Sequence, residues 1–147
     1  IIFNKKNDIK GGLRSDELVS SIDVFTTILD YANSNIPKYL TGKSLVNLIK
    51  GEKTPIREKI ITYLKNPRVP GDPWAKGETG YSYRSKDWHA FWVPQPDKIN
   101  LYNIIDDPYE LNEISKKYPE KVIEIKREII SWNKYIKGRE IFPNEKY

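Results

Sequence analysis

The 147-residue sequence contains no cysteine, no methionine and only one histidine, His89. Without cysteine, disulfides, zinc–thiolate sites and thiol nucleophiles are excluded, and the redox compartment cannot be inferred. A single histidine excludes histidine pairs and, with them, most transition-metal sites. Because a translation product needs an initiator methionine, we interpret the sequence as a piece of a longer protein. The lack of a leader segment then says nothing about localisation.

The charge of the chain does not point to a particular partner. The formal net charge is +5, but 25 basic residues are scattered among 20 acidic ones without forming a stripe. A basic surface suits nucleic acid or a sulfated glycan, whereas scattered charges are typical of a solvated Lys/Glu surface, which we favour. No apolar run approaches a membrane span. We therefore predict neither nucleic acid nor a membrane as a partner, and keep a non-catalytic module that binds anionic polysaccharide as the alternative.

The first third of the chain predicts a buried strand, "IIF", followed by two helices. In "SIDVFTTILDYANSN", apolar residues recur at helical spacing and Ser20 or Ser21 is placed to cap the start. These serines lack the glycine flanks of a nucleophile elbow, so we interpret them as caps. The segment "GKSLVNLIKGE" predicts a short second helix. The apolar stripe of the first helix comprises Ile22, Phe25, Ile28, Leu29 and Ala32.

The remainder predicts an α+β fold. The strand "REKIITYL" precedes a long Pro/Gly loop, "KNPRVPGDPWAKGE", which is followed by the hairpin "TGYSYRSKDWHAFWVP" and the strand "INLYNI". Strands joined by local connections favour an antiparallel sheet, here of four strands. The segment "PEKVIEIKREIISWNKYIKG" predicts a long amphipathic C-terminal helix that covers this sheet. Its apolar stripe comprises Val122, Ile125, Ile129, Trp132 and Ile136.

Two adjacent aspartates, Asp106 and Asp107, are the first candidates for chemistry. Calcium needs six to eight oxygen ligands from spaced positions, and two adjacent carboxylates before a proline do not form such a loop. Aspartate before proline instead favours a turn, because its side chain binds the local backbone. We favour the turn.

His89 and Arg84 lie on the two arms of the predicted hairpin. Histidine has a pKa suited to a general base, but no serine or acid stands at a diagnostic spacing, so we favour a packing or hydrogen-bonding role for His89. Arg84 could bind an anion in a bidentate manner or brace the sheet through a carboxylate. The residues leave both roles of Arg84 open.

The long Pro/Gly loop contains Arg68, Trp74 and Lys76. An aromatic ring beside two cations suits a pocket for an anionic sugar, and a loop pinned by one buried tryptophan is an equal alternative. Loops of this length in a compact domain are usually functional or mobile. The residues alone therefore predict an α+β module without a self-contained catalytic constellation.

Four motifs in family order resemble the C-terminal portion of a sulfatase of the alkaline phosphatase superfamily. They are "SDELVSSIDVFTTILDYA", "LTGKSLVNLIKGE", "GYSYRSKDWHAFWV" and "LYNIIDDPYELNEIS", and the resemblance spans residues 1–137. The Pro/Arg loop with its tryptophan is most similar to iduronate-sulfatase-like members. The chain departs from the family pattern at Thr26, where proline is usual, and at Asn33 to Asn35, where a glycine ends the helix.

The resemblance implies a division of the chain and of the chemistry. Residues 1–52 would be the tail end of the catalytic domain, a strand plus helices at the edge of its α/β sheet, and residues 53–147 a C-terminal subdomain. The parent protein would hydrolyse sulfate esters of glycans in the periplasm or outside the cell. Calcium and a formylglycine would belong to the missing N-terminal domain, because no Cys/Ser-x-Pro-Ser-Arg motif occurs here. This chain would contact that domain and provide one wall of the pocket for the sulfated saccharide. The expected contact residues are Arg68, Trp74, Lys76 and His89.

Overall fold

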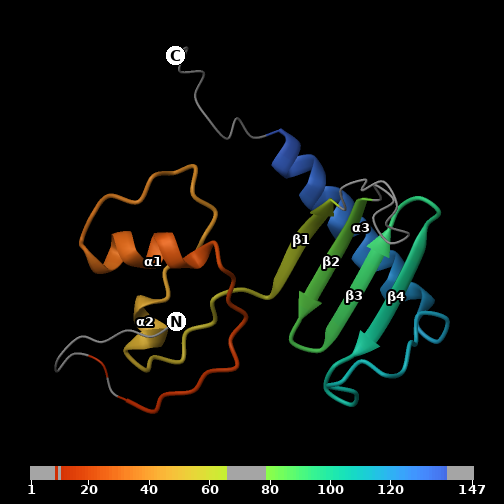
Figure 1. Ribbon diagram of the computed structural model, residues 1–147, viewed down its shortest axis with the longest axis horizontal. Helices are drawn as coiled ribbons and strands as arrows, with labels where there is room; N and C mark the ends of the chain where they lie inside the picture. Colours follow the sequence, from red (N-terminus) through yellow and green to blue (C-terminus); the bar gives the residue numbers. More distant parts are fainter. Residues whose placement is uncertain (1–8, 10, 66–78, 139–147) are drawn as a thin grey trace, which may run out of the picture. The chain divides into compact units, whose positions relative to one another are not determined.

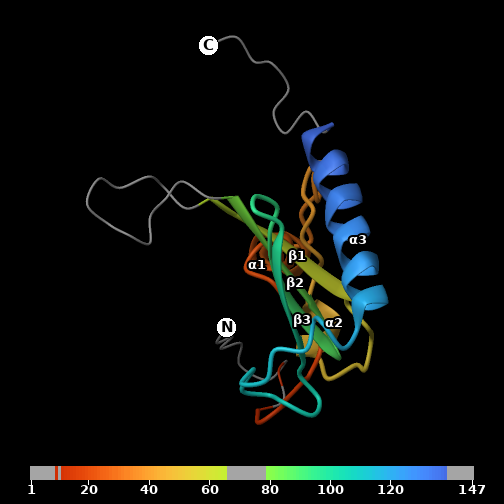
Figure 2. The ribbon, with the colours of Figure 1, turned by 90° about the vertical axis from the view of Figure 1, so that its right-hand side faces the viewer.

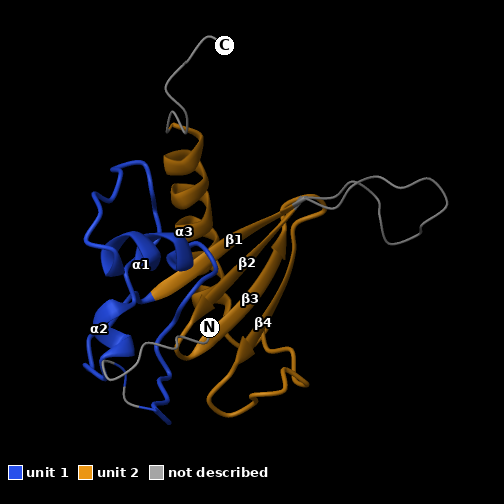
Figure 3. Cartoon of the chain, turned by 60° about the vertical axis from the view of Figure 1, so that its left-hand side comes forward, with its two compact units in different colours: residues 1–58 blue, residues 59–147 orange. Residues whose placement is uncertain are grey.

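The computed structural model describes residue 9 and residues 11–65 and 79–138. The chain divides into two compact units, residues 1–58 and 59–147 (Figure 3). The predicted division after residue 52 falls inside the first unit. The assignment of the two parts to a catalytic domain and a C-terminal subdomain stays a prediction. The predicted "IIF" strand lies outside the described residues.

The first unit contains both predicted helices, α1 (Asp23–Tyr31) and α2 (Val46–Ile49). In α1 three residues of the apolar stripe, Ile22, Phe25 and Ile28, are each at least 50% exposed. Its buried residues are instead polar, namely Asp23, Thr26 and Thr27. The apolar spacing therefore predicted the helix, and the side of it that is buried in this unit is the polar one.

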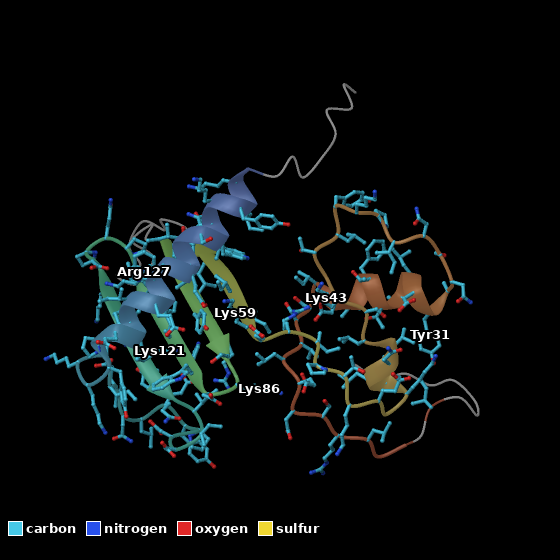
Figure 4. All side chains as sticks on the ribbon, turned by 180° about the vertical axis from the view of Figure 1, so that it is seen from behind. Tyr31, Lys43, Lys59, Lys86, Lys121 and Arg127 are labelled. Carbon is cyan, nitrogen blue, oxygen red and sulfur yellow. The ribbon has the colours of Figure 1, made fainter. Side chains whose placement is uncertain are left out.

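The carboxylate of Asp23 explains why α1 buries its polar side. It accepts hydrogen bonds from the backbone N–H groups of Ser20 at 2.7 Å and of Lys43 at 2.8 Å, and it forms an ion pair with Arg57. A buried carboxylate is tolerated when it is paired and hydrogen-bonded in this way. Figure 4 labels Lys43 in this unit. Asp23 thus ties α1 to the segment that leads into α2.

Thr27 and Gly42 complete this connection. The Thr27 hydroxyl donates to the Asp23 carbonyl at 2.6 Å and accepts from the Leu45 N–H at 3.0 Å. A Cβ atom at Gly42 would lie 2.1 Å from the Ile22 carbonyl oxygen, so only glycine fits this close approach. The segment "LTGKSL" is therefore held against α1 by backbone contact as well as by side chains.

The ends of α1 differ from the predicted caps. The serine cap is wrong, because Ile22 is the N-cap residue and has no side-chain cap bond. The carbonyls of Ser20 and Ser21 instead accept from the first N–H groups of the helix. At the other end Asn33 has a φ of 52°, the left-handed conformation that glycine or asparagine commonly adopts after a helix. Asparagine at this position thus takes the conformation that a glycine would also allow.

The second unit contains the predicted α+β fold (Figure 1). Its four strands form one sheet in the order β1-β2-β3-β4, with every neighbouring pair antiparallel. One long helix packs on one face of this sheet, as the edge-on view in Figure 2 shows. Within the described ranges, no helix combines the length and apolar character that a membrane span requires. The elements are β1 (Lys59–Lys65), β2 (Thr79–Ser85), β3 (Trp88–Val93), β4 (Lys98–Asn103) and α3 (Pro119–Lys137).

The face of the sheet beneath α3, here called the covered face, forms the core. Strand register aligns Tyr83 with Ala90 and Ala90 with Leu101, so these side chains share a face. Ile125 and Ile129 of α3 pack against them and are fully buried. Burying one such aliphatic side chain contributes about 1.5–3 kcal/mol. The predicted apolar stripe of α3 and the predicted hairpin are confirmed. Figure 4 views the sheet from the side of α3 and labels Lys59 on β1 and Lys121 and Arg127 on α3.

The opposite face is covered by no helix or strand among the described residues of the second unit. The strand register that aligns the core residues places the alternate side chains on this opposite face, where polar groups predominate. We call this face of the sheet the open face. Its central residues are Ser82, Arg84, His89, Phe91, Asn100 and Tyr102.

Candidate functional site

Of the four predicted substrate-contact residues, the structure describes one. His89 lies in β3 on the open face. Arg68, Trp74 and Lys76 lie outside the described residues, so their role stays a prediction.

The two ring nitrogens of His89 have different neighbours: one contacts a hydroxyl and the other faces a carboxylate. Its Nε2 atom is 3.1 Å from the Ser82 hydroxyl on the neighbouring strand. Its Nδ1 atom is 2.8 Å from the Oε2 atom of Glu110, although the two do not have the geometry of a hydrogen bond. The side chain remains 25% exposed. The predicted hydrogen-bonding role of His89 is confirmed, and its acidic neighbour comes from a distant part of the chain.

The same Glu110 carboxylate binds Arg84. The distance from Arg84 Nη1 to Glu110 Oε1 is 3.3 Å, and the two side chains are 41% and 31% exposed. Of the two roles left open for Arg84, the structure shows contact with a carboxylate. One carboxylate therefore lies against a guanidinium and an imidazole, both of which remain accessible. We call Ser82, Arg84, His89 and Glu110 the polar cluster.

The loop after β4 places Glu110 at this position. Asp107 accepts a hydrogen bond from the Asn112 N–H at 2.7 Å. Backbone N–H groups, that of Asn112 first, hold the pKa of the Asp107 carboxyl below its usual range. Glu110 follows with a φ of 56°, in the left-handed region that is uncommon outside glycine. The aspartate turn is confirmed, and its consequence is to direct Glu110 to the sheet.

A second carboxylate fixes the other end of this loop. Glu113 Oε1 accepts from the backbone N–H of Leu101 at 3.1 Å and of Ser115 at 2.6 Å. Burial raises the pKa of Glu113, but the hydrogen bonds from Ser115 and Leu101 outweigh this effect, so the pKa is lowered overall. The Ile114 N–H also donates to the Leu101 carbonyl at 2.9 Å. The loop is therefore tied to β4 immediately after Glu110.

An aromatic ring lies beside the polar cluster. Phe91 is two residues from His89 on β3, so the two share the open face. Its ring lies over Gly80 of β2, where an added Cβ would come within 3.0 Å of the ring. Glycine therefore makes room for the phenylalanine, whose side chain is still 38% exposed. The open face thus combines one accessible ring with hydrogen-bonding groups.

The chemistry of this arrangement is that of binding. No group of three or more His, Cys, Asp or Glu residues that could hold a metal ion occurs among the described residues. Asn100 and Tyr102 extend the cluster across β4, with 3.4 Å between the Asn100 Nδ2 and Tyr102 hydroxyl atoms. Sequence reasoning found His89 and Arg84 but missed Glu110. Alternation along the hairpin placed the first two, whereas nothing in the sequence indicates that the loop returns to the sheet.

Comparison with known proteins identifies a family model and relatives that match this chain. Residues 1–134 match the model of the N-sulphoglucosamine sulphohydrolase C-terminal family. The chain is 26% identical to human arylsulfatase K, covering 88% of this chain and 24% of the relative. It is 27% identical to an N-acetylglucosamine-6-O-sulfatase of Bacteroides thetaiotaomicron, covering 99% of this chain and 26% of the relative. It therefore spans about a quarter of the length of these relatives.

Solved structures share the fold. A phosphonate monoester hydrolase from Silicibacter pomeroyi superposes with a TM-score of 0.71 at 17% identity, covering 89% of this chain and 28% of that protein. A protein solved in complex with its substrate D-glucosamine-2-N,6-O-disulfate superposes with a TM-score of 0.62 at 22% identity, covering 85% of this chain and 25% of that protein. At such identities the likeness establishes the architecture.

Proposed function

Because the chain belongs to the N-sulphoglucosamine sulphohydrolase C-terminal family, we propose that it is the C-terminal part of a sulfuric ester hydrolase acting on sulfated glycans. The observation that supports this most strongly is the family match over residues 1–134. Relatives named for sulfatase activity, one of them on N-acetylglucosamine 6-sulfate, support the substrate class.

The reaction itself would take place in an N-terminal domain outside this chain. Calcium and formylglycine are expected there, and this chain's residues do not fit them. No Cys/Ser-x-Pro-Ser-Arg motif occurs in the sequence, and no acidic or histidine cluster suited to a metal occurs in the part that the structure describes. We derive no chemical step for this chain. We also propose a periplasmic or extracellular location for the longer protein, as the resemblance implies.

The contribution of this chain would be one wall of the saccharide pocket. His89 is accessible on the open face, and we propose that Arg68, Trp74 and Lys76 contact the same saccharide. Cations beside an aromatic ring suit a sugar that has a carboxylate or sulfate. Membership among the iduronate-sulfatase-like sulfatases is the finer prediction from the resemblance.

Sulfate release tests the proposed division. The longer protein and the 147-residue chain would each be assayed with calcium on N-acetylglucosamine 6-sulfate, N-sulfoglucosamine and 4-nitrophenyl sulfate. We expect release by the longer protein and none by the chain. Turnover by the chain above a buffer blank, or no turnover by the longer protein, would contradict the proposal. Retention of an inactive longer protein on heparin with a steep salt dependence would favour the polysaccharide-binding alternative.

Trp74→Ala in the longer protein tests the pocket wall. We expect a larger increase in KM for the sulfated sugar than for 4-nitrophenyl sulfate, because only the sugar would reach this side chain. Equal changes for both substrates would count against a pocket role.

A further inference from the structure

The geometry of the open face points to a site that binds the hydroxyl groups of a saccharide. We propose that the polar cluster binds sugar hydroxyls, with Glu110 as the acceptor and Arg84 as the donor, and that the Phe91 ring packs against the apolar side of the same sugar. This inference rests on the proposed function, since it specifies which part of the saccharide meets the chain.

The charge balance of the polar cluster favours hydroxyls over a sulfate. The Glu110 carboxylate already lies 3.3 Å from the Arg84 guanidinium and 2.8 Å from the His89 ring. A bound sulfate would have to approach the same cations beside this carboxylate, and like charges repel. A hydroxyl group both donates and accepts, so it is matched by a carboxylate next to the N–H donors of a guanidinium. The cluster thus suits the uncharged part of a sugar ring.

The accessibility of the polar groups shows that hydrogen-bonding capacity remains. Arg84, His89 and Glu110 are between a quarter and half exposed. Arginine has five N–H donors and a carboxylate about four lone-pair positions, of which the contacts within the polar cluster use only part. Both ring nitrogens of His89 face protein atoms, Nε2 the Ser82 hydroxyl and the buried Nδ1 the Glu110 carboxylate. The remaining capacity therefore belongs to Arg84 and Glu110.

The position of Phe91 supports a sugar as the ligand. Two positions along a strand separate Phe91 from His89, about 7 Å between Cα atoms, so one sugar and its hydroxyls can reach both. Gly80 holds the ring against the sheet while leaving it accessible. Binding sites for small molecules commonly combine an aromatic surface with a few polar groups that fix orientation.

A serine nucleophile is the competing interpretation, because Ser82, His89 and Glu110 form a chain of contacts. Ser82 lies in the middle of β2, where backbone N–H groups belong to the sheet ladders. It has neither the strand-to-helix turn that exposes a nucleophile nor the free N–H groups of an oxyanion hole. We therefore assign Ser82 to the positioning of His89.

Glu110→Gln in the longer protein is the central variant, with Glu128→Gln as its matched control. Glu128 also forms a partly exposed ion pair, at 2.7 Å with Lys59, but on the side of α3. The substrates are N-acetylglucosamine 6-sulfate and N-sulfoglucosamine, compared with 4-nitrophenyl sulfate, which has no sugar. We expect Glu110→Gln to lower kcat/KM for the sugar about 10- to 100-fold, the loss of hydrogen bonds to a charged group. The loss for the aryl sulfate should be much smaller, and Glu128→Gln should change neither.

Binding of N-acetylglucosamine without sulfate is the second measurement, followed by NMR on the same proteins. We expect Glu110→Gln to weaken this binding about tenfold or more, while Glu128→Gln leaves it unchanged. This binding measurement does not require the longer protein to release sulfate. Failure of the proposed function can therefore be distinguished from failure of this inference. Equal losses on sugar and aryl substrates, or unaltered binding of N-acetylglucosamine by Glu110→Gln, would overturn the inference.

Discussion

The two faces of the four-stranded sheet are formed by alternate residues of the same strands, yet they differ in kind. On the covered face, Ala90, Leu101 and the α3 residues Ile125 and Ile129 are fully buried. On the open face, the polar cluster and Phe91 stay accessible. Buried apolar area supplies most of the stability of a small domain, whereas accessible polar groups contribute little. The difference indicates that one face holds the fold together, whereas the other presents accessible polar groups.

The largest expected effect comes from truncation on the covered face. Ile129→Ala should lower the free energy of unfolding by about 2–5 kcal/mol, because it leaves a cavity in a closely packed core. Phe91→Ala on the open face should cost about 1 kcal/mol or less, as surface changes do. Urea unfolding of both variants measures the difference. Equal losses would contradict the division between the faces.

A second variant tests a buried surface that is polar, the inner side of α1. Thr27→Val removes the acceptor of the Leu45 N–H, and leaving a buried donor unpaired costs about 1–3 kcal/mol. Thr26→Val is the matched control, because the buried Thr26 hydroxyl has no hydrogen-bond partner among the described residues. We expect urea unfolding to show a loss for Thr27→Val and little change for Thr26→Val. The reverse order would show that the α1 connection is assigned wrongly.

A third variant sharpens the link between the loop and the open face. Glu113→Ala removes the acceptor for the Leu101 and Ser115 N–H groups, a loss of about 1 kcal/mol. Hydrogen exchange at these two amides should become faster, and binding of N-acetylglucosamine should weaken because Glu110 is less firmly placed. Unchanged exchange would exclude Glu113 as the residue that holds the loop.

The smallest effect is a pH dependence at the turn between β3 and β4. Hydrogen bonds from Lys126, and then from Trp92, lower the pKa of Asp97. A carboxyl with a lowered folded-state pKa stabilises the fold above its unfolded pKa of about 4, and this stabilisation is lost as the pH falls through the folded value. Urea midpoints below pH 4 should therefore fall less steeply for Asp97→Asn than for the wild type. Identical slopes would show that Asp97 does not contribute.

The sequence alone predicts the second unit well for a physical reason. Alternation along the hairpin and the spacing of Ile125 and Ile129 both report burial against one partner, and the structure contains that partner. For α1 the apolar spacing predicts only the helix. Asp23 and Thr27 are buried because they satisfy backbone groups of a segment that is distant in the sequence. Such a contact leaves no periodic signal.

The candidate site was only partly predictable for a related reason. His89 and Arg84 lie in register within one hairpin, so their proximity follows from strand pairing. Glu110 joins them through a turn at Asp107 and a left-handed backbone. From the sequence, these features predict a turn, but they do not predict that the Glu110 side chain is directed toward the sheet.

The most direct test of the open face as a ligand site is a crystal structure of the longer protein with N-acetylglucosamine 6-sulfate bound. The account predicts a sugar hydroxyl within about 3.2 Å of the Glu110 carboxylate, with the sugar ring against Phe91 and the sulfate directed away from Glu110. A bound sugar that contacts no residue of the open face, or whose sulfate lies between Arg84 and His89, would contradict it.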